Sequence, residues 1–400
     1  MHAHTIVTRV LGPCLSSLHA KRAKALLRAT SALVQGALAS LSGIALSLRA
    51  TTGLKHRIKS VDRLLGNTAL ESARREIYRA LAQRWLKGVD HILLVIDWSD
   101  LTRDQHWQLL RASVALDGRS LTLYEEVHAQ NYLGNPKVHR RFLRTLHSLL
   151  PASSKVIVMT DAGFHAPWFN AVSELGWCFI GRLRGRNRVL LQHEPFWRPA
   201  RALYRLAGSK VLDLGQGRYV RSNSVDVRLV LAKRQDKQRH QLTVFGNKAA
   251  SKKSKKNARR EGEPWLLATS PALSHLAAEG IVALYRQRMG IEQSFRDTKN
   301  LRVGMGLEVS RSRSAQRFNV LLLIVHLAAF VQTLIGESAK AAQLELQFCA
   351  TRRKDRAEIS VLTLARRILD GPPHLLKQLL PTQAIAPLKQ QAIDAYDIAL

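Results

Sequence analysis

Apolar positions in the first part of the chain recur at the spacing of an α-helix. From about residue 15 to residue 85, apolar side chains such as Leu26 and Leu33 are separated by basic ones, which predicts helices with an apolar stripe and a cationic face. Gly66 and Asn67 are residue types that commonly follow the end of a helix. The pattern therefore predicts a helical segment over residues 1–85.

Strand-like runs follow this segment. The runs 91–97 and 155–161 are continuous and rich in β-branched residues, as expected for strands that are buried on both faces. Between them, two alternating runs at about 108–116 and 119–127 are joined by Asp117-Gly118. An Asp-Gly pair in this place predicts a hairpin, because glycine accepts the positive φ of a tight turn.

Helices and strands then alternate along the chain. Helices are predicted near 137–150 and 166–175, and a strand is predicted at 177–183. Three strands followed by alternating helices and strands are typical of an α/β fold, a mixed sheet with helices on its faces.

A β-rich insertion is predicted over residues 186–262. It contains the strand-like runs 225–231 and 241–245. Its basic stretch 252–260 has no apolar partners, so we expect a mobile loop there.

The last part of the chain is predicted to be mainly helical. Strand character returns at 263–270, and helices are predicted at 275–299, 319–336 and near 358–369. The longest apolar run lies in the second of these helices; it is shorter than the roughly 20 residues that span a bilayer, so a buried helix is expected and no membrane partner. The predicted organisation has three segments: a helical domain at 1–85, an α/β domain with its insertion at 86–370, and a helical tail at 371–400.

The charge of the chain indicates a polyanionic partner. Lys and Arg number 62 against 29 Asp and Glu, a formal net charge of +33 at pH 7. Nucleic acid is the leading candidate, because a folded protein with this much self-repulsion usually neutralises a polyanion. The cationic helices of residues 1–85 then become a candidate DNA-binding domain, with an ordinary solvated face as the alternative. Charge alone does not separate an enzyme from a ribosome-like or chromatin-like binder.

The cysteines give no sign of a zinc site or a disulfide framework. Cys14, Cys178 and Cys349 lie far apart and form no CxxC pair. This spacing fits a reducing cytoplasm, and no secretory signal is recognised at the N-terminus.

Two predicted strands end in aspartate, at Asp97 and Asp161. A side chain directly after such a strand lies at the carboxyl edge of the sheet, where ligands of α/β proteins bind. A third acid, Glu292, lies on the predicted helix 275–299. Carboxylates that gather must be neutralised. Lys or Arg could do this, but oxygen-rich clusters are what Mg²⁺ or Mn²⁺ requires.

The third acid and three polar residues near it are spaced to share one helix face. Tyr285, Arg288, Glu292 and Lys299 are separated by three, four and seven residues. At 3.6 residues per turn these positions fall on one stripe. A solvent-exposed face with i,i+4 ion pairs would explain the stripe equally well without the two aspartates.

This combination resembles the signature of the DDE class of bacterial insertion-sequence transposases, in the subgroup called insertion-sequence family four. The resemblance rests on the spacing Tyr-x₂-Arg-x₃-Glu-x₆-Lys with two strand-end aspartates upstream. It is supported by the stretches KSVDRLLGN (59–67), VIDWSD (95–100), LRASVALDGRSLTLYE (110–125), TDAGF (160–164) and EPWLLAT (263–269). The likeness weakens in the insertion and in the last thirty or so residues.

The resemblance implies a ribonuclease-H-like catalytic domain in a cut-and-paste DNA transposase. In such a protein Asp97, Asp161 and Glu292 would coordinate two Mg²⁺ (or Mn²⁺) ions for in-line phosphoryl transfer on DNA. Cleavage would occur at terminal inverted repeats, and the 3′ ends would be joined to target DNA. The resemblance further implies a homodimer on double-stranded DNA, in the bacterial cytoplasm and associated with the nucleoid.

The resemblance also assigns DNA contacts. Arg288 and Lys299 would hold phosphates, and Tyr285 would donate a hydrogen bond to one. Trp265 matches a tryptophan that stacks on a flipped base in relatives; a core aromatic on a strand is the equal alternative.

Other acids and histidines in the same region receive lesser roles. Asp100, Asp117, Glu125 and Glu126 are expected in turns or at the surface, with Asp100 the best candidate for supporting the metal ligands. Histidines 91, 128 and 165 are expected to be structural or to face DNA.

Three rival functions remain at this point. A ribonuclease-H-like nuclease or resolvase would share the fold and the three acids but would never join DNA. A non-catalytic DNA-binding regulator would keep the charge but not need the intact acids. An RNA-binding protein would leave the aspartate pair unexplained.

Overall fold

A computed structural model describes residues 2–185, 187–233, 247–252, 254–256, 262–349 and 359–400. The chain divides into two compact units, which are described separately. Unit 1 comprises residues 1–155 and 289–395, and unit 2 comprises residues 156–288 and 396–400. The strands of the described residues belong to a ten-stranded mixed sheet. With its flanking helices, this α/β architecture is compatible with the predicted ribonuclease-H-like fold.

The N-terminal part of unit 1 is helical, as predicted. Its helices are α1 (Ala3–Leu11), α2 (Ala20–Val34), α3 (Leu41–Ser47), α4 (Leu54–Leu65) and α5 (Thr68–Leu86). Helix α4 ends at the predicted place, with Gly66 as its C-cap. The Asn67 side chain then begins α5 by accepting a hydrogen bond from the backbone N–H of Leu70 at 2.8 Å.

The strands of unit 1 include the predicted hairpin. They are β1 (His91–Asp100), β2 (Trp107–Leu116) and β3 (Arg119–Ala129), in the order β3-β2-β1 with antiparallel pairing. The turn between β2 and β3 contains Gly118 at φ 63°, the positive value that the Asp-Gly pair predicts. Helix α6 (Pro136–Leu149) follows, with Asn135 capping its first turn.

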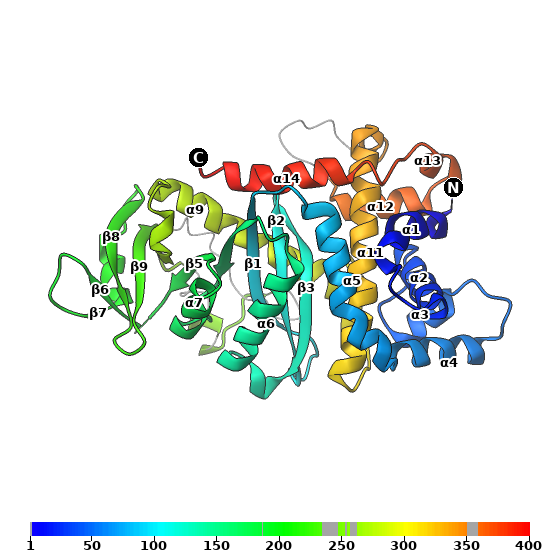
Figure 1. Ribbon diagram of the computed structural model, residues 1–400, viewed down its shortest axis with the longest axis horizontal. Helices are drawn as coiled ribbons and strands as arrows, with labels where there is room; N and C mark the ends of the chain where they lie inside the picture. The colour runs from blue at the N-terminus through cyan, green and yellow to red at the C-terminus, as the bar shows by residue number, and fades with distance from the viewer. Residues whose placement is uncertain (1, 186, 234–246, 253, 257–261, 350–358) are drawn as a thin grey trace. The chain divides into compact units, whose positions relative to one another are not determined.

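Helix α11 (Ala315–Ala341) is the core helix of unit 1. It packs against β3 and also against α2, α5 and α12 (Val361–Asp370), so it connects the N-terminal helices to the sheet (Figure 1). The helix is longer than predicted, and by length and composition alone it could cross a membrane; 83% of its most apolar window is buried in the protein. Burial in a protein core accounts for that composition. The tail contains α13 (Pro373–Lys377) and α14 (Ile385–Asp397).

Unit 2 contains the remaining strands. In sheet order they are β4 (Lys155–Thr160), β5 (Cys178–Leu183), β10 (Trp265–Thr269), β9 (Val225–Ala232), β8 (Leu212–Tyr219), β6 (Arg188–Leu191) and β7 (Arg198–Pro199). Strands β4 and β5 are parallel, and the other neighbouring strands of unit 2 are antiparallel. Helix α7 (Ala166–Ser173) connects β4 to β5. The insertion is therefore β-rich, as predicted.

Two predicted features of the insertion fall wholly or partly outside the described residues. The run 241–245 is outside them. Of the basic stretch 252–260, residues 252 and 254–256 are described and are helical, where a loop was expected. The Ser251 hydroxyl accepts a hydrogen bond from the backbone N–H of Ser254 at 3.1 Å, which gives this turn a cap.

The helix predicted at 275–299 is not continuous. It consists of α9 (Ala278–Arg286), a 3₁₀ turn at Gln287–Met289 and α10 (Gly290–Lys299). Gly290, the first residue of α10, lies against the backbone of β3. A Cβ at this position would lie 2.7 Å from the carbonyl carbon and oxygen of Arg119, so only glycine lets the start of α10 approach β3 this closely.

Candidate active site

Asp97 lies near the end of β1, on a defined face of the unit 1 sheet. The register pairs it with Arg111 of β2, so the two side chains share one face. Its Oδ1 accepts a hydrogen bond from the backbone N–H of Trp98 at 2.8 Å. Because side chains alternate along a strand, Ser99 lies on the same face as Asp97.

Helix α10 is packed on this face. Lys299 Nζ donates to Ser99 Oγ at 2.7 Å and to the Asp100 carbonyl oxygen at 3.0 Å. Glu292 is exposed and lies seven residues before Lys299, close to two helical turns, so the two side chains share one stripe of α10. The structure thus carries Glu292 on a helix docked against the Asp97 face of β1.

The environment of Lys299 differs from that of an ordinary surface lysine. Its partners are the strand-end groups of Ser99 and Asp100, and its ammonium lies 5.4 Å from the ring centroid of Phe295. Burial, and then the nearby Arg111 guanidinium, lower the pKa of Lys299 below its ordinary value. The Asp100 carboxylate accepts hydrogen bonds from two glutamine side chains, Gln105 and Gln108. Asp100 therefore organises the end of β1.

Asp161 lies in unit 2, directly after β4. It is half-buried, and its Oδ1 accepts a hydrogen bond from the backbone N–H of Gly163 at 2.8 Å. This turn leaves the carboxylate at the end of a strand that is parallel to β5.

Three of the predicted DNA-contact residues gather in unit 2. The rings of Trp265 and Tyr285 meet edge-to-face with centroids 5.1 Å apart, and the Arg288 guanidinium lies 5.9 Å from the Tyr285 ring centroid. Tyr285 is buried, whereas Trp265 and Arg288 are half-exposed. The predicted single stripe is thus divided, since Tyr285 belongs to α9, Arg288 to the 3₁₀ turn, and Glu292 and Lys299 to α10.

Two arginines beside this aromatic pair were missed by the sequence analysis. Arg182 donates to the Glu263 carbonyl oxygen at 3.0 Å, and Arg184 forms an ion pair with the Glu263 carboxylate at 2.8 Å. The available signal was their spacing of two residues, with Arg182 in β5 and Arg184 directly after its end.

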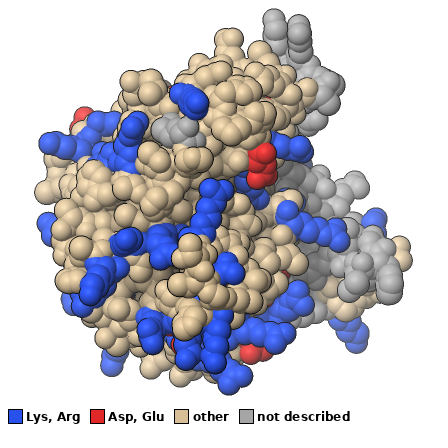
Figure 2. Space-filling view, turned by 90° about the vertical axis from the view of Figure 1, so that its right-hand side faces the viewer, with Lys and Arg blue, Asp and Glu red and all other residues tan. Residues whose placement is uncertain are grey.

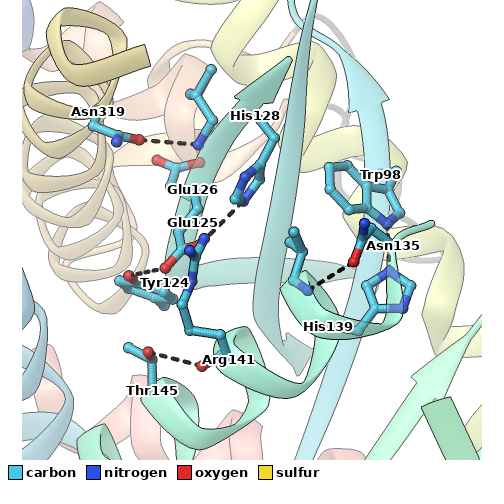
Figure 3. Close-up of polar contacts among 12 residues, drawn as sticks. Trp98, Tyr124, Glu125, Glu126, His128, Asn135, His139, Arg141, Thr145 and Asn319 are labelled. Carbon is cyan, nitrogen blue, oxygen red and sulfur yellow. Dashed lines mark hydrogen bonds and ion pairs between the residues drawn. The ribbon is translucent and has the colours of Figure 1, made fainter. Parts of the chain in front are cut away.

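Glu125 and Glu126 are buried, which corrects the prediction of turn or surface roles. Glu125 pairs with Arg111 at 2.7 Å on the α10 face of the sheet. Glu126 accepts hydrogen bonds from Tyr124 at 2.6 Å and Arg141 at 3.2 Å and contacts His128 at 3.1 Å (Figure 3). Each acid is buried because cationic or hydroxyl partners replace water.

The Glu126 cluster fixes α6 against the second face of the sheet. Burial by itself would raise the pKa of Glu126, but the hydrogen bonds from His128 and Tyr124 outweigh it and lower the pKa to about 2. Beside the cluster, Trp98 Nε1 donates to His139 Nε2 at 3.0 Å (Figure 3 shows both side chains). Trp98 and His128 are therefore structural.

A family model describes this part of the chain. The model for the transposase DDE domain matches residues 89–331, which include Asp97, Asp161 and Glu292. The chain belongs to the transposase DDE domain family. A search of curated proteins found no match.

Membership of this family identifies the protein as a transposase, an enzyme of DNA recombination whose partner is DNA. Enzymes of this family generally use divalent metal ions, and the three predicted ligands are carboxylates, the donors that Mg²⁺ and Mn²⁺ prefer. Among the residues the structure describes, no three or more His, Cys, Asp and Glu side chains form a group that could hold a metal ion. The donor chemistry of the individual residues fits such an ion.

The N-terminal helices of the transposase have a basic groove. It lies between α2 and α4 and is lined by Lys21, Lys24, Arg28 and Ser60, with Val61 and Leu64 among its apolar residues. Lys and Arg side chains are spread over the face in Figure 2, and acidic side chains are visible at few points on it. This distribution suits a phosphate backbone.

Proposed function

We propose that this transposase moves DNA by a cut-and-paste reaction, in which it cleaves at terminal inverted repeats and joins the 3′ ends to target DNA. The observation that carries the proposal is the docking of α10, with Glu292, on the face of β1 that presents Asp97. Asp161, at the end of β4, is the third member of the proposed catalytic set.

The three carboxylates of the proposed catalytic set suit phosphoryl transfer on DNA. Asp97, Asp161 and Glu292 would hold two Mg²⁺ or Mn²⁺ ions, which when bound would stabilise the attacking and leaving oxygens of an in-line displacement at phosphorus. The protein's own contribution is to hold these carboxylates in position. The Trp98 and Gly163 backbone N–H groups each orient one of the aspartates.

Basic and aromatic residues would hold the DNA. Arg288 and Lys299 are proposed to bind phosphates, and Tyr285 is proposed to donate a hydrogen bond to one. The Tyr285 ring also lies close to the Arg288 guanidinium, which it would help to hold. Trp265 is half-exposed beside Tyr285, which suits stacking on an extruded base. The basic groove between α2 and α4 is proposed to bind the transposon end.

The finer classification rests on sequence resemblance. The spacing around Glu292 supports membership of insertion-sequence family four, with similarity to the transposase of the tetracycline-resistance composite transposon. That resemblance supports a homodimer assembled on two DNA ends, in the bacterial cytoplasm and associated with the nucleoid.

The test is cleavage and joining of defined DNA ends. The protein is incubated with Mg²⁺ and DNA that carries the inverted repeats flanking its gene, and breaks at the repeat ends and products joined to a plasmid are scored. Asp97→Asn, Asp161→Asn and Glu292→Gln should each abolish cleavage and keep end binding. Normal cleavage by Asp161→Asn would refute the proposed set. Cleavage without joining would instead support a nuclease or resolvase, and binding without cleavage a regulator.

A further inference from the structure

A buried cation lies directly beneath α10. Arg111 of β2 is 1% exposed, and its guanidinium pairs with the Glu125 carboxylate at 2.7 Å through Nε and Nη2. Its third nitrogen, Nη1, donates to Ser294 Oγ at 2.9 Å. The guanidinium thus uses all three of its nitrogens to join β3 to α10 through β2.

Ser294 is the point where α10 receives this contact. It lies two residues after Glu292, it is buried, and its hydroxyl is also 3.4 Å from the Thr122 hydroxyl of β3. The cation further lies 4.9 Å from the ring centroid of Phe295. The second turn of α10 is therefore held by directional contacts on its buried side.

The backbone of Glu125, the acid of this pair, is held in turn by helix α5. Arg74 of α5 is buried and donates through Nη2 to the Glu125 carbonyl oxygen at 2.7 Å. A continuous chain of hydrogen bonds therefore runs from α5 through β3 and β2 to α10. Buried ion pairs are poor sources of stability, because the desolvation of both charges offsets their attraction. What this pair provides is direction, because its hydrogen bonds fix the orientation of the guanidinium.

We infer that Arg111 is a positioning residue, which fixes α10 through Ser294 and so sets the location of Glu292 relative to Asp97. The inference rests on the proposed function, in which Glu292 is catalytic. Arg111 shares a sheet face with Asp97 in the β1–β2 register and also contacts α10. This one side chain therefore fixes the position of α10 relative to β1. A shift of about 1 Å in a catalytic group commonly costs on the order of a hundredfold in rate.

The decisive variant is Ser294→Ala, which removes the contact to α10 and leaves the buried pair intact. At saturating end DNA, the cleavage rate should fall about tenfold or more. The DNA concentration for half-maximal rate and the melting temperature should change little. Thr298→Ala is the matched control, because its buried hydroxyl lies on the same helix but donates to the Ser294 carbonyl within the helix. That variant should keep the wild-type cleavage rate.

Two substitutions of Arg111 separate positioning from folding. Arg111→Lys keeps the charge but lacks the planar fork, so it should fold and still cleave slowly. The double variant Arg111→Met with Glu125→Met removes both charges together, so it should fold without an unpaired ion and show the same loss of rate at unchanged DNA affinity.

Hydrogen exchange provides a readout that needs neither metal nor activity. Amides of residues 290–295 should exchange faster in Ser294→Ala than in wild type, while those of β1 stay protected. If wild type cleaves DNA and Ser294→Ala cleaves at the same rate, with the same exchange in α10, the positioning role is wrong. If wild type itself does not cleave, the proposed function fails, and the exchange result alone still decides whether Arg111 holds α10.

Discussion

His326 is a buried histidine in the middle of α11. It is 4% exposed, its ring lies 4.7 Å from the Tyr78 ring, and its Nδ1 has no hydrogen-bond partner among the described residues. Burial, and then the nearby Arg111 cation, lower the pKa of His326 to about 3. The folded protein therefore keeps this imidazole neutral at pH values where an unfolded histidine is charged.

This burial makes the folded state sensitive to mild acid. Below about pH 6.5 the histidine is protonated in the unfolded state but stays neutral in the folded state. The free energy of unfolding therefore falls by about 1.4 kcal/mol for each unit that the pH is lowered, until the folded pKa is reached. His326→Leu should remove this contribution. The free energy of unfolding is measured by urea denaturation at pH 7.5 and at pH 5. Its decrease between these pH values should be roughly 2 kcal/mol smaller in the variant than in wild type. Equal losses in the two proteins would contradict the assignment. Glu126 interferes little, because its stabilising contribution is lost mainly below its unfolded pKa of about 4.3, outside this pH range, and is the same in both proteins.

The roles of Glu125 and Glu126 show what residue patterns leave undetermined. Adjacent residues on a strand face opposite sides, and two adjacent acids in a strand suggest at least one exposed face. Here both faces of β3 are covered, and each acid meets a cation from a neighbouring element: Arg111 of β2 pairs with Glu125, and Arg141 of α6 pairs with Glu126. The two acids themselves do not indicate that helices cover both faces of their strand. By contrast, the hairpin at Gly118 and the position of Asp161 directly after β4 depend on neighbours in sequence, and both were predictable. The strand predicted to end at Asp97 continues to Asp100.

At the scale of elements, the boundary between α9 and α10 depends on contacts that periodicity does not contain. Apolar spacing continues through the 3₁₀ turn, so a single helix was the natural prediction. Gly290 is required because the Arg119 backbone lies where a side chain would begin. The Arg119 side chain then pairs with Asp297 at 2.6 Å, which fixes α10 to the same strand end. Helix α11 was found by its apolar run, but its polar ends, with Ser314 as the cap, were missed.

Gly290→Ala tests this close approach. Alanine is the better helix former by about 1 kcal/mol, so a free helix would gain stability. In this protein the added methyl must displace α10 or β3, and we expect a net loss of about 1–3 kcal/mol in unfolding free energy together with slower DNA cleavage. Gly53→Ala is the control, because no atom lies within 4 Å of the methyl it adds. Equal or greater stability of Gly290→Ala in urea denaturation would show that α10 adjusts freely.

At the scale of the whole molecule, the charge sets how the transposase meets DNA. The formal net charge of +33 is carried along the chain, and the basic groove of α2 and α4 is one place where it is concentrated. Each phosphate that a cation neutralises releases counterions, so the logarithm of the affinity falls linearly with the logarithm of the salt concentration, with a slope of about −0.9 per phosphate. Composition alone predicted this behaviour, but the groove required the folded helices.

The groove is tested by the salt dependence of binding. The triple variant Lys21→Ala, Lys24→Ala and Arg28→Ala should bind end DNA more weakly at low salt, and its slope should be less steep than that of wild type by about 2 to 3, as expected for three lost phosphate contacts. Fluorescence anisotropy between 50 and 300 mM salt measures both values. The control removes an equal charge at three exposed residues outside the groove, Arg75, Arg79 and Lys87. If both variants lower the slope equally, the groove has no special role and the charge acts only as a diffuse field. A smaller effect in the control assigns the phosphate contacts to α2.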